Sequence, residues 1–175
     1  MRKRGYKVSG RSTQKILKEA EQLRKSLIWS ERKYFPIVSF LEVLAEENIL
    51  NFEVCEDSEV ANRGEAFYDP VEKKIIIPDS VYEAAYSGQG RARFTITHEL
   101  GHFFLEHSVV FGRNDDVVWK PYIDSEWQAN TFAGFFLAPP SLISLKSTAE
   151  QIAVDFGLSF EAAIIALNNA KKFRS

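Results

Sequence analysis

Two histidines stand four positions apart in this chain, with a glutamate directly after the first, in the string His98-Glu-Leu-Gly-His102. Residues four apart on an α-helix lie on one face, about 40° apart around the axis, so both imidazoles can reach one small cation. Glu99 projects about 100° round the axis, where it can act on a water held by that cation. The string therefore predicts a helix with two zinc ligands and a general base, the HExxH arrangement.

The residues around the motif favour a metal site over two incidental histidines. Residues 93–105 are strongly apolar, and the whole chain has three His. Imidazoles and a carboxylate placed among apolar side chains cost free energy unless they are paired or bound to a metal. We therefore expect Zn²⁺ at this helix, although a set of two His and one Glu also accepts Mn²⁺.

Composition narrows the class of protein. The 175 residues, 45% of them hydrophobic and fourteen of them Phe, predict one domain, residues 1–175, with a substantial core. A net charge of −2 argues against direct nucleic-acid binding. A lone Cys agrees with a reducing compartment. No apolar run predicts a membrane span, so we expect a cytoplasmic protein, with the basic residues 1–7 as a solvated, disordered end. The sequence predicts no oligomeric state.

Hydrophobic periodicity predicts an α+β fold. Apolar spacing predicts helices at about residues 12–29, 36–48, 79–87, 91–106, 124–137, 147–156 and 159–171. Ser12 or Thr13 would cap the first of these helices, and Asp124 or Ser125 would begin the fifth. Alternation predicts strands at 51–55, 64–68 and 74–77, which we expect to form a small three-stranded antiparallel sheet. Residues 12–140 would form the core that carries the HExxH helix, and residues 147–171 a C-terminal helical corner. The polar stretch 107–123 is expected as a flap over the site.

A catalytic zinc takes three protein ligands, so a third must come from outside the motif. In HExxHxxGxxH proteins it is a later His, but that position is Ser108 here and the Gly position is Leu105. His107 points away from the metal if the helix continues past it. Glu126 is favoured, because Asn130 follows it on the same face of the next helix and can hydrogen-bond a ligand imidazole. The competing carboxylates are Asp124, a better helix cap, and Glu106, a better solvated helix end.

A peptidase also needs a group that stabilises the oxyanion and a strand that binds the substrate. A developing oxyanion needs a donor, and Tyr122 and His107, which flank the expected flap, rank ahead of Tyr68. Tyr122 and His107, like Asn130, are also candidates to hydrogen-bond and support a metal ligand. An extended peptide commonly binds along a strand edge. Residues 74–78 are the natural edge, ending at a Pro that would block continuation, and the substrate-strand candidates are Ile75, Ile76 and Ile77.

The order of these motifs resembles a known family. Gly64-Glu-Ala-Phe-Tyr-Asp-Pro70, then HELGH at 98–102, then Glu126-x-x-Ala-Asn130-x-Phe-Ala133, closely resembles the ImmA/IrrE zinc metallopeptidases. The resemblance implies an intracellular endopeptidase that cleaves a helix-turn-helix repressor, often encoded nearby, and so derepresses a mobile element or a stress operon. It also implies His98, His102 and Glu126 as zinc ligands and Glu99 as the base. Members commonly carry a second Glu where this chain has Gln128.

One segment suggests a different class of protein. Residues 152–167 read as a helix-turn-helix, with Gly157 in the turn and Ser159 as the next cap. The alternative function is therefore a DNA-binding or partner-binding regulator with a non-catalytic metal site. The second helix argues against DNA, because it begins with Glu161, alanines and isoleucines and offers no side chain that reads bases near its start.

Overall fold

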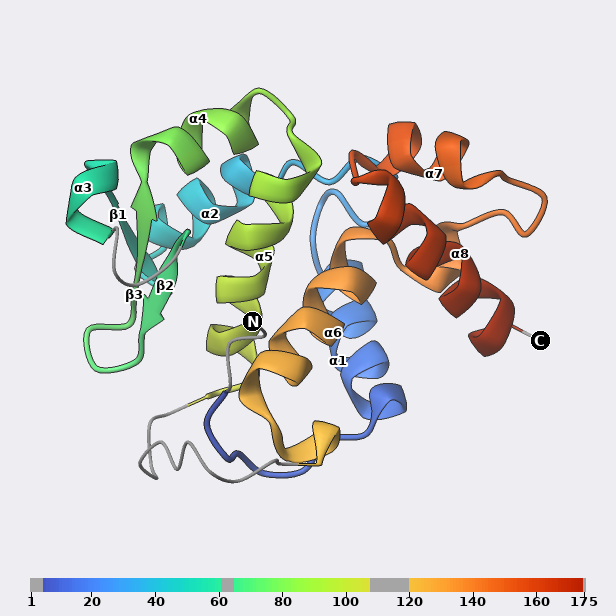
Figure 1. Ribbon diagram of the computed structural model, residues 1–175, viewed down its shortest axis with the longest axis horizontal. Coiled ribbons are helices and arrows are strands. Elements are labelled where there is room, and N and C mark those ends of the chain that lie inside the picture. The colour runs from blue at the N-terminus through green and yellow to red at the C-terminus, as the bar shows by residue number, and fades with distance from the viewer. Residues whose placement is uncertain (1–4, 61–64, 108–119, 175) are drawn as a thin grey trace.

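The computed structural model describes residues 5–60, 65–107 and 120–174, and its mixed α+β architecture confirms the predicted fold class (Figure 1). The helices of the described residues are α1 (Thr13–Lys25), α2 (Ile37–Glu46), α3 (Asp57–Val60), α4 (Asp79–Tyr86), α5 (Gly90–Phe104), α6 (Ser125–Leu137), α7 (Ala149–Phe156) and α8 (Phe160–Phe173). The strands are β1 (Asn51–Cys55), β2 (Phe67–Asp69) and β3 (Lys74–Pro78), and short 3-10 turns occur at η1 (Pro121–Ile123) and η2 (Pro140–Leu142). Most of the expected flap, residues 108–119, lies outside the described residues.

Side-chain caps set where several helices begin. The hydroxyl of Ser12 accepts from the Lys15 amide at 3.2 Å and starts α1. The carboxylate of Asp124 accepts from the Trp127 amide at 3.1 Å and starts α6. Such caps satisfy amides that have no partner inside the helix. The helix starts expected from these polar residues are therefore confirmed.

The sheet is mixed, so the antiparallel prediction is wrong in this detail. Its order is β1-β3-β2, with β1 parallel to β3 and β2 antiparallel to β3. The chain leaves β1, forms β2, and returns so that β3 lies between the other two, an order that strand alternation does not encode. The prediction that residues 74–78 form an edge is also wrong. Ile75 and Ile77 are fully buried in the central strand, as expected for a continuous apolar run.

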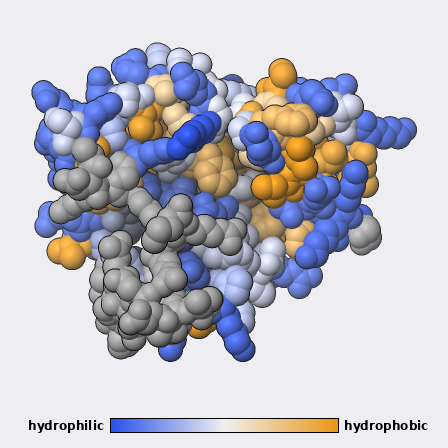
Figure 2. All heavy atoms as spheres, viewed as in Figure 1, coloured by the Kyte–Doolittle hydropathy of each residue, from blue (hydrophilic) through white to orange (hydrophobic). Residues whose placement is uncertain are grey.

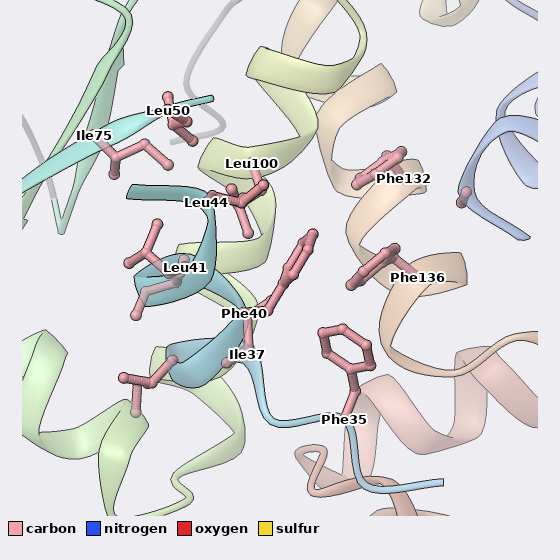
Figure 3. Packing of buried hydrophobic residues seen from close by; sticks show 14 of the residues in the cluster. Phe35, Ile37, Phe40, Leu41, Leu44, Leu50, Ile75, Leu100, Phe132 and Phe136 are labelled. Carbon is pink, nitrogen blue, oxygen red and sulfur yellow. The ribbon is translucent and has the colours of Figure 1, made fainter. Parts of the chain in front are cut away.

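The main core lies between the sheet, α2, α5 and α6, and Figure 3 shows its side chains. Leu50 and Ile75 extend from the sheet side toward Leu41 and Leu44 of α2. On the other side, aromatic rings join α2 to α6, with the Phe40 and Phe136 ring centroids 5.8 Å apart. This packing holds α5 beside α6 (Figure 1).

The C-terminal helices α7 and α8 pack around a second hydrophobic cluster that includes Ile152 and Phe156. Arg93 of α5 joins this pair to the core, because its guanidinium donates to the carbonyls of Phe156 and Gly157 at 3.2 and 3.1 Å. Apolar side chains are exposed over α7 and α8, among them Val154 and Ile165 (Figure 2). Within the described ranges, no helix has the length and hydrophobicity needed to cross a membrane.

Candidate metal centre

Three side chains from two helices meet at one point. The Nε2 atoms of His98 and His102 are 3.1 Å apart, and the two carboxylate oxygens of Glu126 lie 3.4 Å from them. Four ligands around zinc at about 2.0–2.1 Å lie roughly 3.3 Å from one another when the geometry is tetrahedral. The donor types and their spacing therefore fit a zinc ion held by two His and one Glu. Among the described residues, these three are the His, Cys, Asp or Glu side chains whose ligand atoms lie close enough together, within 4.8 Å of one another, to hold one metal ion.

Packing between α5 and α6 decides which carboxylate completes the set. Glu126 lies in the first turn of α6, which runs beside α5. Asp124 uses its carboxylate to cap α6, since it accepts from the Trp127 amide. Glu106 is exposed and follows the end of α5 in a left-handed conformation with φ of 54°. The structure thus brings Glu126, and neither of the two competing carboxylates, to the histidines.

His107 lies behind His102 rather than at the metal position. Helix α5 ends at Phe104, and the left-handed turn at Glu106 brings the chain back. The Nδ1 atom of His107 is 2.9 Å from Nδ1 of His102, and its Nε2 is 3.0 Å from Oε1 of Gln128. The sequence expectation that His107 points away assumed a continuing helix, and that helix stops. His107 contacts the ring nitrogen of His102 that faces away from the metal position.

Of the other predicted site residues, Asn130 contacts His98 directly, and Tyr122 lies beside the site. Oδ1 of Asn130 is 3.1 Å from Nδ1 of His98, where it can accept a hydrogen bond and leave Nε2 free for a metal. Tyr122 meets the site through its backbone, since its carbonyl accepts from Nε2 of Gln128 at 2.8 Å. Its side chain is about half exposed, at 46%. Ile75, Ile76 and Ile77 lie in the central strand, as described above.

Glu99 is buried between the histidines and the sheet. Its Oε1 lies 3.9 Å from Nε2 of His98, and its Oε2 accepts from the Tyr68 amide of β2 at 2.8 Å. Burial raises the pKa of Glu99, and the neighbouring His102 and His98 oppose that rise in part. A carboxyl with a raised pKa exchanges protons closer to neutral pH, which suits a general base.

Charge coupling links the remaining residues of the cluster. Burial raises the pKa of Glu126, but hydrogen bonds with His102 and His98 outweigh it and hold that pKa well below the usual range of a carboxyl. Burial lowers the pKa of His98, yet Glu126 and Glu99 raise it by more. Burial and the nearby His102 lower the pKa of His107 to about 4, so this imidazole is neutral at pH 7.

Sequence reasoning missed Gln128, which supports His102 through His107. Gln128 is fully buried, and its amide contacts His107, Arg11 and the carbonyls of Ser9 and Tyr122. An amide near the start of a largely apolar helix was the available signal. The described part of the expected disordered end, residues 5–7, instead packs against the start of α6: the Tyr6 amide donates to the Ser125 hydroxyl at 2.9 Å. Nothing in the local pattern of residues 5–11 indicated that partner.

Comparison with known proteins agrees with this geometry. A family model described as the IrrE N-terminal-like domain, Peptidase_M78, matches residues 52–168, more than half of the chain. The chain belongs to the Peptidase_M78 family. The resemblance noted from the HELGH and ExxANxFA elements is therefore confirmed, and the family supports a metallopeptidase-like or regulator-related protein.

Solved structures add a likeness of fold. A search of curated proteins finds no match. A Mycobacterium tuberculosis transcriptional regulator superposes with a TM-score of 0.54 at 16% sequence identity. The match covers 85% of this chain and 45% of the regulator, so the chain spans less than half the length of that relative.

Proposed function

We propose that this protein is a zinc-dependent endopeptidase. The observation that carries the proposal is the position of Glu99, whose two oxygens lie between the His98–His102–Glu126 cluster and the backbone of β2. A metal that serves structure alone is usually enclosed by four protein ligands and has no use for a base. Three ligands with a carboxylate beside them match the requirements of metal-assisted hydrolysis.

The residues divide the chemistry between them. Zinc in this site would lower the pKa of a water molecule and polarise the carbonyl of the scissile peptide. Glu99 takes the proton of the attacking water and then gives it to the leaving amine. The Tyr68 amide holds Oε2 of Glu99 at 2.8 Å, which leaves Oε1 directed toward the cluster. Asn130 holds the ring of His98 in the orientation that presents Nε2.

The substrate strand is reassigned from β3 to β2. Both sides of β3 are paired, with β1 and with β2, so Ile75, Ile76 and Ile77 have no edge to offer a peptide. Within the described chain β2 is an edge strand, and its Tyr68 amide already points to Glu99. An extended peptide aligned along β2 would place its backbone beside the base. This location supports cleavage of an unfolded or extended segment.

We further propose a helix-turn-helix repressor, encoded near this protein, as the substrate, with derepression of a mobile element or stress operon as the result. Membership of the Peptidase_M78 family supports this choice. Repressors act in the cytoplasm, so the proposal places the enzyme there. Zinc is the proposed ion, and Mn²⁺ suits the same ligands less well.

The test is co-expression with the neighbouring repressor. Wild-type protein should convert the repressor into two fragments of defined mass, and Glu99→Gln should leave it intact while retaining its zinc. Mass spectrometry gives the cleavage position, and elemental analysis gives the metal content of both proteins. An intact repressor with zinc-loaded wild type would refute this substrate, and absence of bound zinc in the wild type would refute the enzyme.

The second candidate is a partner-binding or DNA-binding regulator with a non-catalytic metal. Its support is the α7–Gly157–α8 turn, where Gly157 has a left-handed φ of 63°, and the exposure of Ile165 at 60%. An apolar exposed face suits a protein partner better than DNA. Equal effects of wild type and Glu99→Gln on transcription would favour this candidate, and a salt-dependent gel shift would specify DNA.

A further inference from the structure

A row of hydrogen bonds joins the N-terminal segment to Nδ1 of His102, the ring nitrogen that faces away from the metal position. The side-chain amide of Gln128 contacts the N-terminal segment, because its Nε2 lies 2.9 Å from the carbonyl oxygen of Ser9 and 2.8 Å from that of Tyr122. Peptide carbonyls only accept hydrogen bonds, so both partners require the NH₂ group on that side. The orientation of the Gln128 amide is therefore determined, and Oε1 is the atom that faces His107.

The orientation of Gln128 sets the hydrogen positions on two imidazoles. Oε1 of Gln128 only accepts, so the His107 nitrogen 3.0 Å away, Nε2, must carry a hydrogen. The Arg11 guanidinium donates to the same Oε1 from 3.3 Å and opposes a second positive charge nearby. A neutral His107 then has its lone pair on Nδ1, which faces Nδ1 of His102 at 2.9 Å.

We propose that Gln128 and His107 act as positioning residues that fix the tautomer of His102. With an acceptor behind it, His102 carries its hydrogen on Nδ1 and presents the Nε2 lone pair to the metal position. This inference rests on the proposed zinc site, and it adds the segment around Ser9 and Arg11 to that site. The two histidine ligands are thus held differently: Asn130 supports His98 directly from α6, whereas His102 depends on a relay that reaches residue 9.

The N-terminal segment is itself firmly attached, as such a relay requires. The Val8 amide donates to the Ile123 carbonyl at 3.0 Å, and the Arg11 amide donates to the Tyr122 carbonyl at 2.8 Å. Nε of Arg11 also pairs with Glu19 of α1 at 3.4 Å. Because Gln128 uses both donors and its acceptor, a Glu at this position could accept from His107 but could not donate to the two carbonyls. The choice of Gln over Glu is explained by this requirement.

The first test reads the tautomers directly. The chain has three His, so ¹⁵N–¹H long-range NMR spectra can resolve each ring. His107 should show its hydrogen on Nε2 with and without zinc, and zinc-loaded His102 should show it on Nδ1. A His107 that carries its hydrogen on Nδ1, or on both nitrogens, would overturn the relay.

The second test measures zinc affinity by competition with a chromophoric chelator, and the site geometry by the visible absorption of Co²⁺-substituted protein. His107→Phe removes the acceptor and should weaken zinc binding about 10–100-fold, the usual cost of losing such a partner. His107→Asn restores an acceptor near the Nδ1 position without the bond to Gln128. The zinc affinity of this variant should therefore fall between that of wild type and that of His107→Phe. Gln128→Met removes the anchor and should weaken binding and shift the Co²⁺ spectrum, even if His107→Phe fails to fold.

The control is Ile152→Ala, which creates a cavity in the second hydrophobic cluster. It should lower the melting temperature while leaving zinc affinity unchanged. Folded His107 and Gln128 variants with wild-type affinity and spectrum would overturn the relay but leave the peptidase proposal intact. A wild-type protein that binds no zinc would overturn both.

Discussion

The glycine inside the HELGH motif offers a sharp test of how α5 meets α6. A Cβ added at Gly101 would lie 3.1 Å from the carbonyl oxygen of Ala129, 3.2 Å from its Cα and 3.2 Å from Cδ1 of Phe132. Unstrained contacts of carbon atoms are about 3.5–4.0 Å. Two of the three atoms belong to the backbone of α6, which cannot rotate away, so Gly101→Ala should push α6 outward by a few tenths of an ångström.

Gly134 of α6 provides the matched control. An added Cβ there meets nothing within 4 Å. Both substitutions should stabilise the fold by about 1 kcal/mol through helix propensity. Gly101→Ala alone should also destabilise it by about 1–3 kcal/mol through overpacking. Gly134→Ala should therefore raise the free energy of unfolding by about 1 kcal/mol, and Gly101→Ala should be lower than Gly134→Ala by about 1–3 kcal/mol. For a chain of this size each kcal/mol shifts the melting temperature by about 2–4 °C.

The assay is thermal unfolding of both variants in chelator, followed by zinc titration. Because Glu126 lies one turn before Ala129, a displaced α6 should also weaken zinc binding in Gly101→Ala and not in Gly134→Ala. If the Gly101 variant is as stable as the Gly134 variant and binds zinc equally well, the close approach of the two helices at Gly101 is refuted.

Three further outcomes are expected. Zinc at about 1,000 times its Kd should stabilise the fold by about 4 kcal/mol, and calorimetry in which chelator leaves the melting temperature unchanged would contradict this. Zinc affinity should fall as the pH drops through the raised pKa of His98, because protons then compete with zinc for the ring nitrogen. The loss should be about tenfold per pH unit for each proton displaced, and it should begin at a higher pH than for an ordinary His. A pH-independent affinity would show that no proton is displaced. Arg93→Met should cost about 2 kcal/mol or more in urea unfolding, because the carbonyls of Phe156 and Gly157 lose their donor, and an unchanged midpoint would be inconsistent with that role.

The amino-acid sequence determined the features that depend on neighbours along the chain. The spacing of His98 and His102 placed both rings on one helix face, and Ser12 and Asp124 marked helix starts, because helical period and capping act within one turn. Glu126 was favoured by the same local argument, through its Asn130 partner one turn later.

Tertiary packing decided what local patterns leave open. Alternation along a strand does not specify the order of strands in a sheet. In the folded protein β3 is central, and β2 lies at the edge beside Glu99. Helix α5 ends at Phe104, and the left-handed conformation of Glu106 turns His107 back toward His102. Tertiary packing and this left-handed residue set where the helix stops. The support of the metal centre by Gln128 joins residues 119 positions apart, and such a contact exists only once α1, α5 and α6 have packed together.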